Sequence, residues 1–478
     1  MILRFSSILV LGVLTTLPAF ADKDALNNTI DALDDEAWAV AQQLWDWAEP
    51  GYQETKSSKL LADTLKEAGF TIEMGVADIP TAFTATYGSG KPVIGILGEF
   101  DALPGLAQEA EPTRTPREDG NGYGQACGHH LFGAGSMLAA MAVAEQIKVG
   151  THPGTIRFYG TPAEEGGAAK VFMVRDGLFD DVDIVLHWHP GSGNSAGDPT
   201  NLSRIAAKFR FYGRSAHAAG APEQGRSALD AVVLMNYAAE LMREHTPEYT
   251  RIHHVITAGG LAPNVVPDFA EVYYYVRHPQ APVVKELYAR LLKCAEAGAL
   301  ATETELEVEF LAGTHNLLPN DVLSQVTLNN LKALNDLSYT DDEKSFAMEI
   351  QESLQAPRAL DSIHEVRDSK GGTSKGSTDV GDVSWVVPTT GLRTACWVPG
   401  TPAHSWQAVA AGGTSIGRKG MILAARVLAA TAWDIAHDEV LMNEAKAELQ
   451  DRLEGEPYSA MLEPGQKAPL TYRDAPTR

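Results

Sequence analysis

The stretch Gly122-Tyr-Gly-Gln-Ala-Cys-Gly-His-His-Leu-Phe-Gly133 places a thiol, Cys127, and two imidazoles, His129 and His130, within four residues. Glycines precede the thiol and an apolar run of helical period follows the histidines, which predicts a loop that enters a helix. Thiolate and imidazole together suit zinc and similar divalent metals. Two residues are too few to hold an ion, so other segments must supply further ligands, a base and a substrate pocket.

The composition indicates a globular protein with more than one domain. The chain has 478 residues, which exceeds the usual size of a single core. Its hydrophobic content of 44% and charged content of 21% are ordinary for such a protein. The formal net charge of −24 argues against nucleic acid and against stable association with anionic membranes. An anionic substrate would have to meet a few local Arg or Lys residues.

The first residues, Met1 to Ala21, have the pattern of a secretory signal peptide. Arg4 gives a positive start, residues 8–17 are mostly apolar, and Ala19-Phe20-Ala21 is an A-x-A cleavage site. The alternative is a membrane anchor, but the apolar run is short for a span. We therefore expect cleavage after Ala21 and a periplasmic or secreted protein.

The cysteine count does not fit a disulfide framework. Cys127, Cys294 and Cys396 are an odd number in a chain that we expect to be exported. A bridge between Cys294 and Cys396 stays open as an alternative. Cys127 is then the residue left over, as a metal-bound or catalytic thiol would be.

Three predicted strands end in loops that carry acids or histidines. Glu99 and Asp101 follow residues 93–97, and Glu164 and Glu165 follow residues 155–159. Open α/β sheets place their ligands at these strand ends. Adjacent carboxylates are common on solvated surfaces, but the Gly-Gly pair after Glu165 indicates a loop that approaches something closely. One carboxylate can bind metal while its neighbour polarises a water.

The remaining histidines are more ambiguous. His187 and His189 accompany the strand predicted at residues 183–188, and we expect them to point to opposite faces, so that only one reaches a shared site. His404, in the loop Pro402–Trp406, would on its own be an ordinary loop histidine. Residues 203–313 differ in character and predict helices on one face of an antiparallel sheet.

Seven short motifs follow one another along the chain. They are Gly98-Glu-Phe-Asp-Ala-Leu-Pro104, Ala126-Cys-Gly-His129, Pro162-Ala-Glu-Glu-Gly-Gly167, Gly213-Arg-Ser-Ala-His-Ala218, Pro263-Asn-Val-Val-Pro267, Ser377-Thr-Asp-Val-Gly381 and Thr401-Pro-Ala-His404. Each motif alone is weak, but seven in order are specific. In this order the chain resembles the co-catalytic metallopeptidases of the aminoacylase and glutamate-carboxypeptidase type, and within them the amidohydrolase branch with a thiol ligand. The likeness runs from about Trp38 to the last helices.

The resemblance implies a doubly wound α/β catalytic domain that binds metal and is interrupted by an inserted α+β lid and dimerisation domain. After a signal peptide at residues 1–21, the catalytic domain would comprise residues 22–202 and 314–478. The lid would comprise residues 203–313.

The resemblance also implies two divalent metal ions, zinc first because of the thiolate, with manganese as an alternative. Glu164 would be the general base, and Asp101 would orient a ligand imidazole. His187 stays the alternative to His189 as the strand ligand. His130 stands where the family usually has Asp or Asn, and we expect it to be only a neighbour of the site. The implied metal ligands are Cys127, which would bridge both ions, His129, Glu165, His189 and His404.

Three positions in the lid would meet the substrate. By resemblance His217 stabilises the oxyanion, often from across a dimer interface, although alone it could be a surface histidine. Asn264 would contact substrate, although it could be a turn residue. Arg277 or Arg214 would hold the substrate carboxylate, because a guanidinium binds this planar anion in bidentate fashion.

The implied function is metal-dependent hydrolysis of an amide bond in N-acyl amino acids or small dipeptides, with p-aminobenzoyl-glutamate as the favoured substrate. The enzyme would be a homodimer through its lid, and a related subunit could take part. The alternatives are an aminoacylase or dipeptidase of other specificity, a hydrolase with Cys127 as nucleophile, and an exported binding protein whose lid closes without reaction.

Overall fold

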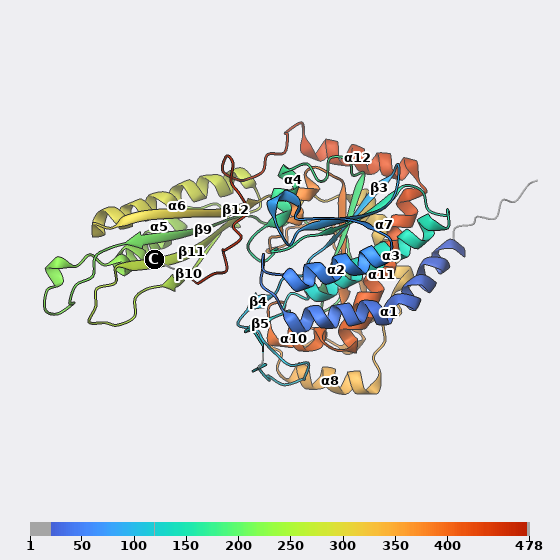
Figure 1. Ribbon diagram of the computed structural model, residues 1–478, viewed down its shortest axis with the longest axis horizontal. Helices are drawn as coiled ribbons and strands as arrows, with labels where there is room; N and C mark the ends of the chain where they lie inside the picture. Colours follow the sequence, from blue (N-terminus) through green and yellow to red (C-terminus); the bar gives the residue numbers. More distant parts are fainter. Residues whose placement is uncertain (1–20, 119, 476–478) are drawn as a thin grey trace, which may run out of the picture.

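The computed structural model describes residues 21–118 and 120–475, which form two large sheets with their helices (Figure 1). The larger sheet has eight strands in the order β1-β2-β6-β3-β7-β14-β8-β13, and the smaller has four in the order β10-β11-β9-β12. A separate two-stranded sheet pairs β4 (Leu103–Pro104) with β5 (Tyr123–Gly124). The predicted α/β class with an inserted α+β unit is confirmed. The predicted signal peptide, residues 1–21, lies outside the described residues except for Ala21, the first residue of α1.

The central strands of the larger sheet run parallel. β3 pairs in parallel with β6 and β7, and β7 pairs in parallel with β14. Every residue of β3 is buried, as expected for a strand covered on both faces. The strands of this sheet are β1 (Thr71–Met74), β2 (Phe83–Gly88), β3 (Val93–Gly98), β6 (Thr155–Gly160), β7 (Ile184–Gly191), β8 (Asn194–Ala196), β13 (Val366–Asp368) and β14 (Thr389–Ala395).

Long helices cover this sheet (Figure 1). α3 (His129–Lys148) packs on β3, β6 and β7, and it lies between α1 (Ala21–Trp47) and α11 (Ser415–Ala436). α3 is buried along nearly its whole length because small residues such as Ala134 and Ala139 allow these close contacts. The other helices of this part are α2 (Thr55–Glu67), α4 (Ala169–Arg175), α7 (Asp321–Leu334), α8 (Asp341–Glu352), α9 (Val380–Ser384), α10 (Trp406–Gly412) and α12 (Glu439–Leu453).

The four-stranded sheet is antiparallel and carries helices on one face only, as the sequence predicts. Apolar side chains alternate along its strands, so that Phe209, Phe211 and Val272 pack against the helices. The opposite face is polar. β9 begins at Ser203 and β12 ends at Thr314, which is why we place the division of the chain there. The elements are β9 (Ser203–Tyr212), β10 (Arg251–Ala258), β11 (Phe269–His278), β12 (Glu305–Thr314), α5 (Ala228–Arg243) and α6 (Ala281–Thr302).

One predicted boundary differs from the structure. β7 extends to Gly191, beyond the strand predicted at residues 183–188, so His189 belongs to the strand. Cys294 and Cys396 are both free thiols, which rules out the alternative of a bridge between them. Within the described ranges, no helix has both the length and the apolar character that crossing a membrane requires.

Candidate metal centre and active site

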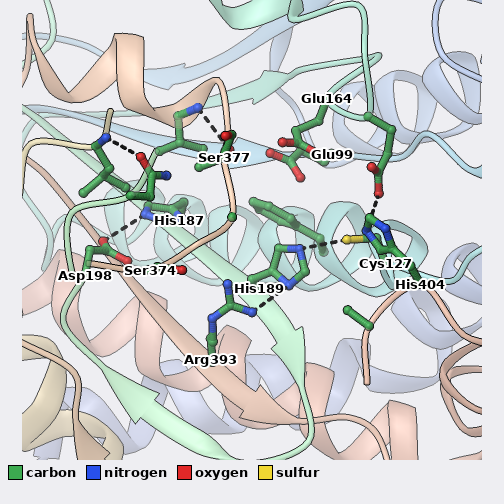
Figure 2. A pocket seen from close by; sticks show the side chains of 18 of the residues that line it. Glu99, Cys127, Glu164, His187, His189, Asp198, Ser374, Ser377, Arg393 and His404 are labelled. Atoms are coloured by element: carbon green, nitrogen blue, oxygen red, sulfur yellow. Dashed lines mark hydrogen bonds and ion pairs between the residues drawn. The ribbon is translucent and has the colours of Figure 1, made fainter. Parts of the chain in front are cut away.

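The predicted site loops meet at one edge of the larger sheet. Glu99 and Asp101 follow β3, Glu164 and Glu165 follow β6, and the parallel pairing of these strands brings their carboxyl ends together. A cavity of about 620 Å³ opens there, and Cys127, His189 and His404 also line it (Figure 2). Open parallel sheets place ligands at this edge, so the position agrees with the prediction.

In the loop before α3, Gly128 lies in close contact with Pro190. Gly128 has φ +78°, and a Cβ added there would lie 2.8 Å from the Cβ of Pro190. Only glycine meets both requirements without strain. α3 then begins at His129. This geometry places the Sγ of Cys127 3.3 Å from Nε2 of His189, which comes from β7.

Asp101 lies where its predicted role requires. Its Oδ1 is 2.9 Å from Nδ1 of His129, and its Oδ2 accepts a hydrogen bond of 3.0 Å from the backbone N–H of Glu165. The carboxylate therefore fixes the ring of one predicted ligand, His129, and the backbone of another, Glu165. The opposite ring nitrogen, His129 Nε2, lies 3.1 Å from Oε2 of Glu99 and is free to bind an ion.

Two ligand groups share the thiol. The donor atoms of Cys127, His129 and His189 lie within 4.8 Å of one another, and so do those of Cys127, Glu165 and His404. A third group, formed by Glu99, His129 and Glu164, adjoins them. Figure 2 shows Cys127 beside His404 and linked to His189.

The residues of the site fit a divalent metal ion, as two buried donor atoms and the types of donor show. Within the described part of the chain, the buried atoms His129 Nε2 and Glu165 Oε1 have only ion-pair contacts, with Glu99 at 3.1 Å and with His404 at 3.2 Å. Neither contact has the geometry of a hydrogen bond, and buried polar atoms that lack one are costly, so these two atoms indicate a ligand. Thiolate, imidazole and carboxylate together are a donor set that suits zinc.

The pKa values of the two adjacent carboxyls, Glu164 and Glu165, are shifted in opposite directions. Burial and the nearby carboxylates of Glu99 and Glu165 raise the pKa of Glu164 well above its ordinary value. Burial would also raise the pKa of Glu165, but its contact with His404 outweighs this and lowers the pKa to about 2. Such divergence between neighbouring groups separates an ionised ligand from a group that can carry a proton.

His404 forms the other side of this pair. Its Nε2 lies 3.2 Å from Oε1 of Glu165. Contacts with Cys127 and Glu165 raise the pKa of His404 to about 11. The loop histidine therefore contacts two predicted ligands, Cys127 and Glu165, and is not the ordinary loop residue that its sequence context alone would indicate.

The expectation that His187 and His189 point to opposite faces is wrong. Residues two apart on a strand share a face, and both side chains line the same cavity. They differ in partners: His187 Nε2 lies 3.1 Å from Oδ2 of Asp198, whereas His189 reaches Cys127. The structure thus brings His189 to the thiol and leaves His187 on the opposite side of the cavity (Figure 2).

His130 is buried beside the site but not in it. Its Nε2 lies 3.1 Å from the carbonyl oxygen of Gly412, and burial lowers the pKa of its ring to about 3. It is absent from the residues that line the cavity. This position agrees with the expectation that it is only a neighbour.

The three lid positions separate in the structure. Arg277 lines the cavity and donates a hydrogen bond of 3.2 Å to Oγ of Ser377. His217 and Asn264 are exposed on loops of the lid and do not line the cavity, and His217 Nδ1 accepts a hydrogen bond of 3.0 Å from the N–H of Gly220. Within one chain they do not reach the metal ligands. Arg214 is exposed and donates to the carbonyl oxygen of Gln224.

Sequence reasoning missed a buried ion triad beneath the cavity. The Nζ of Lys170, in α4, lies 2.7 Å from Oε1 of Glu99 and 2.7 Å from Oδ1 of Asp379, and all three side chains are almost fully buried. Burial alone would lower the pKa of Lys170, but Asp379 and Glu99 raise it. The signal was a single lysine in the apolar segment Ala168–Val174, directly after the Gly-Gly pair. Three cavity arginines, Arg204, Arg393 and Arg473, were also missed.

Metal-dependent hydrolases are the class of protein to which this fold and this donor set correspond. The model of the family described as peptidase family M20/M25/M40 matches residues 95–408. The chain belongs to that family, and it is an enzyme that hydrolyses peptide or linear amide bonds.

Named relatives agree with this membership. The chain is 40% identical to one of the subunits of p-aminobenzoyl-glutamate hydrolase of Escherichia coli, over 91% of this chain and 96% of that protein. It is 28% identical to Xaa-Arg dipeptidase of Mus musculus, over 89% and 92%. In structure it is similar to the aminobenzoyl-glutamate utilization protein of Klebsiella pneumoniae, with a TM-score of 0.59 and 16% identity over 86% of this chain and 98% of that one.

Proposed function

We propose that the enzyme hydrolyses the amide bond of N-acyl amino acids or small dipeptides, with p-aminobenzoyl-glutamate as the favoured substrate. The observation that carries the proposal is the placement of Glu164 beside two ligand groups that share Cys127. Extensive identity to a p-aminobenzoyl-glutamate hydrolase supports the choice of substrate. Two divalent ions, zinc in the first place and manganese as the alternative, suit the mixed thiolate and carboxylate donors.

The residues divide the chemistry between them. Cys127, His129, Glu165, His189 and His404 would hold the metal, which when bound polarises a carbonyl and makes water more acidic. Glu164 accepts the proton of the attacking water, because its raised pKa suits a base that must also release a proton. It then passes that proton to the leaving nitrogen. Arg277 binds the carboxylate that remains on the product.

Chelation combined with a substrate screen tests the proposal. The purified protein is incubated with N-acyl amino acids and dipeptides, and products are identified by mass spectrometry. We expect hydrolysis that disappears on exhaustive chelation and returns with zinc or manganese. Activity that survives chelation but not thiol alkylation would establish Cys127 as nucleophile instead. Ligand binding without turnover of any amide would identify a binding protein.

We further propose that the active enzyme is a dimer formed through the lid. β10 is an edge strand of the lid sheet, and its Val255 and Ile256 are 55% and 43% exposed. Exposed apolar edge strands are typical pairing surfaces. His217 does not reach the cavity of its own chain, so a second copy could present it to the neighbouring site, where it would hold the oxyanion and Asn264 would contact substrate.

Complementation between two inactive variants tests this arrangement. Co-expression of Glu164→Gln and His217→Ala chains should yield roughly a quarter of the parent activity, because half of the dimers are mixed and one site in each is intact. Each variant alone should be slower by about 10²-fold or more, since a general base or an oxyanion donor is missing. A mixture no more active than its components would show that His217 acts within its own chain or not at all.

We also propose export to the periplasm or medium. The positive start, the apolar residues 8–17 and the Ala19-Phe20-Ala21 site support this. The N-terminal sequence of the protein recovered from the exported fraction should begin directly after Ala21. A protein that retains Met1 in the cytoplasm would refute the proposal.

A further inference from the structure

Three guanidinium groups line the cavity on its lid side, two of them over the ring of Tyr275 and the third, that of Arg473, over the ring of Tyr472. Arg204 stacks over the ring of Tyr275 at 4.7 Å and Arg277 at 5.2 Å. Arg473 lines the same cavity and donates a hydrogen bond of 3.1 Å to the backbone oxygen of Glu165. In residues 21–118 and 120–475, none of these arginines forms an ion pair with a carboxylate, and the Nε of each is buried without a hydrogen-bond partner.

This arrangement is unfavourable in the protein alone. Arg204 and Arg277 stand directly opposite each other in the register of β9 and β11, where like charges repel. Burial and the charge of Arg204 lower the pKa of Arg277, whereas burial of Arg204 is outweighed by Tyr275, Tyr273 and nearby carboxylates, which raise its pKa. Arg277 is therefore the less favourably placed of the two cations. Buried charges are normally paired, so the cluster indicates an anion that arrives with the substrate.

Arg473 reaches this place because the chain after α12 crosses to the lid and returns. We call residues 456–475 the crossing segment (Figure 1, dark red). Its Gln466 donates to the backbone oxygens of Phe310 and Leu311 in the lid strand β12. The backbone oxygen of its Tyr472 accepts a hydrogen bond of 2.9 Å from Nζ of Lys208.

The end of the crossing segment is anchored on the catalytic side as well. Tyr472 is 4% exposed, and its ring meets the ring of Tyr52 edge to face at 5.8 Å. A Cβ on Gly166, in the loop of the general base, would lie 2.6 Å from the Tyr472 ring. These contacts therefore fix the position of Arg473 relative to the lid arginines and to the Glu164–Glu165 loop.

We propose that Arg204, Arg277 and Arg473 together bind both carboxylates of a dicarboxylic amino acid, and that Arg473 is a substrate-binding residue supplied by the crossing segment. The inference rests on the amide hydrolysis proposed above and deepens it. One carboxylate is satisfied by one bidentate arginine. Three arginines leave two positive charges unmatched by a monocarboxylate, and a second carboxylate removes one of them. The enzyme therefore selects an acidic residue on the carboxyl side of the scissile amide.

Kinetics with a matched pair of substrates test this selection. N-benzoyl-glutamate and N-benzoyl-norvaline differ in whether the side chain ends in a carboxylate. The Arg473→Met variant should raise KM for the glutamate compound by about 10- to 100-fold, because a hydrogen bond between charged groups is lost. Its kcat should change little, and the norvaline compound should be affected far less. Arg473→Lys should restore part of the difference, whereas a merely structural defect would affect both substrates alike.

A neighbouring exposed residue supplies the control. Asp474 contacts Gln53 at the surface, so Asp474→Ala should leave both substrates unchanged. Thermal unfolding of each variant separates loss of fold from loss of binding. Equal KM values of the parent for both substrates, or equal weakening of both by Arg473→Met, would overturn the inference.

Calorimetry separates this inference from the proposed reaction. The metal-loaded Glu164→Gln protein is titrated with free L-glutamate and with L-norvaline, so no turnover is required. We expect glutamate to bind at least about 10-fold more tightly, and expect Arg473→Met to remove that preference. If no amide is cleaved and the preference still depends on Arg473, the proposed function fails and this inference stands. Absence of a preference, or a preference that Arg473→Met leaves intact, overturns the inference whatever the enzyme cleaves.

Discussion

The Glu164→Gln variant is expected to lose about 10²- to 10⁴-fold in kcat, the usual contribution of a general acid and base, while it retains its metal. Glutamine has nearly the same shape as glutamate, but it cannot accept the proton of the attacking water. Glu164 lines the cavity beside the ligands of both groups, and its raised pKa marks it as the carboxyl that carries a proton. Activity measurements and metal analysis on the same sample check both parts of this prediction.

The neighbouring carboxyl is the matched control. Glu165→Gln should instead lower the metal content, because Glu165 is the ionised member of the pair and contacts His404. Both variants replace a carboxylate by an amide, at adjacent positions of one loop. Different outcomes therefore cannot come from a general disturbance of the loop. Full activity of a metal-loaded Glu164→Gln protein would refute the assignment of the base.

The second large effect is expected from Lys170→Met. This change removes the cation between Glu99 and Asp379 and leaves two buried carboxylates with no counter-charge. Removing one partner of a buried ion pair lowers the free energy of unfolding by about 3–5 kcal/mol. Urea unfolding of the parent and the variant measures the loss.

Two further variants show whether charge is the cause. The triple variant Lys170→Met, Glu99→Gln, Asp379→Asn has no uncompensated charge and should recover much of the lost stability. Lys344→Met removes an exposed pair with Asp341 and should cost no more than about 1 kcal/mol. A small effect of Lys170→Met, or no recovery in the triple variant, would show that the triad does not stabilise the fold through its charges.

The sequence predicted the fold and the ligand loops because both follow local rules. Continuous apolar strands indicate a parallel sheet, and the carboxyl ends of such strands converge. The acids after β3 and β6 could therefore be placed together from the amino-acid pattern alone. Neither rule depends on which distant residue a side chain will meet.

The missed residues depend on distant pairings. Lys170 meets Glu99 and Asp379 across 71 and 209 positions of sequence, and no local pattern encodes such a pairing. Arg473 lies in a segment of irregular structure whose path is set by contacts with Lys208 and Tyr52. The prediction that His187 and His189 point to opposite faces was wrong for another reason. Side chains alternate along a strand, so residues two apart share a face.

The contact between Gly128 and Pro190 also sets how the metal centre responds to its ions. Gly128 directly follows Cys127, and Pro190 directly follows His189, so two ligand-bearing segments touch at a point where even a methyl group does not fit. The distance between thiol and imidazole is therefore governed by the main chain more than by side-chain rotation. This close contact restricts how far Cys127 and His189 can move relative to each other, which preorganises the two predicted ligands. The side chain of His404 is 52% exposed, so among the predicted ligands it would have the room to adjust to metals of different radius.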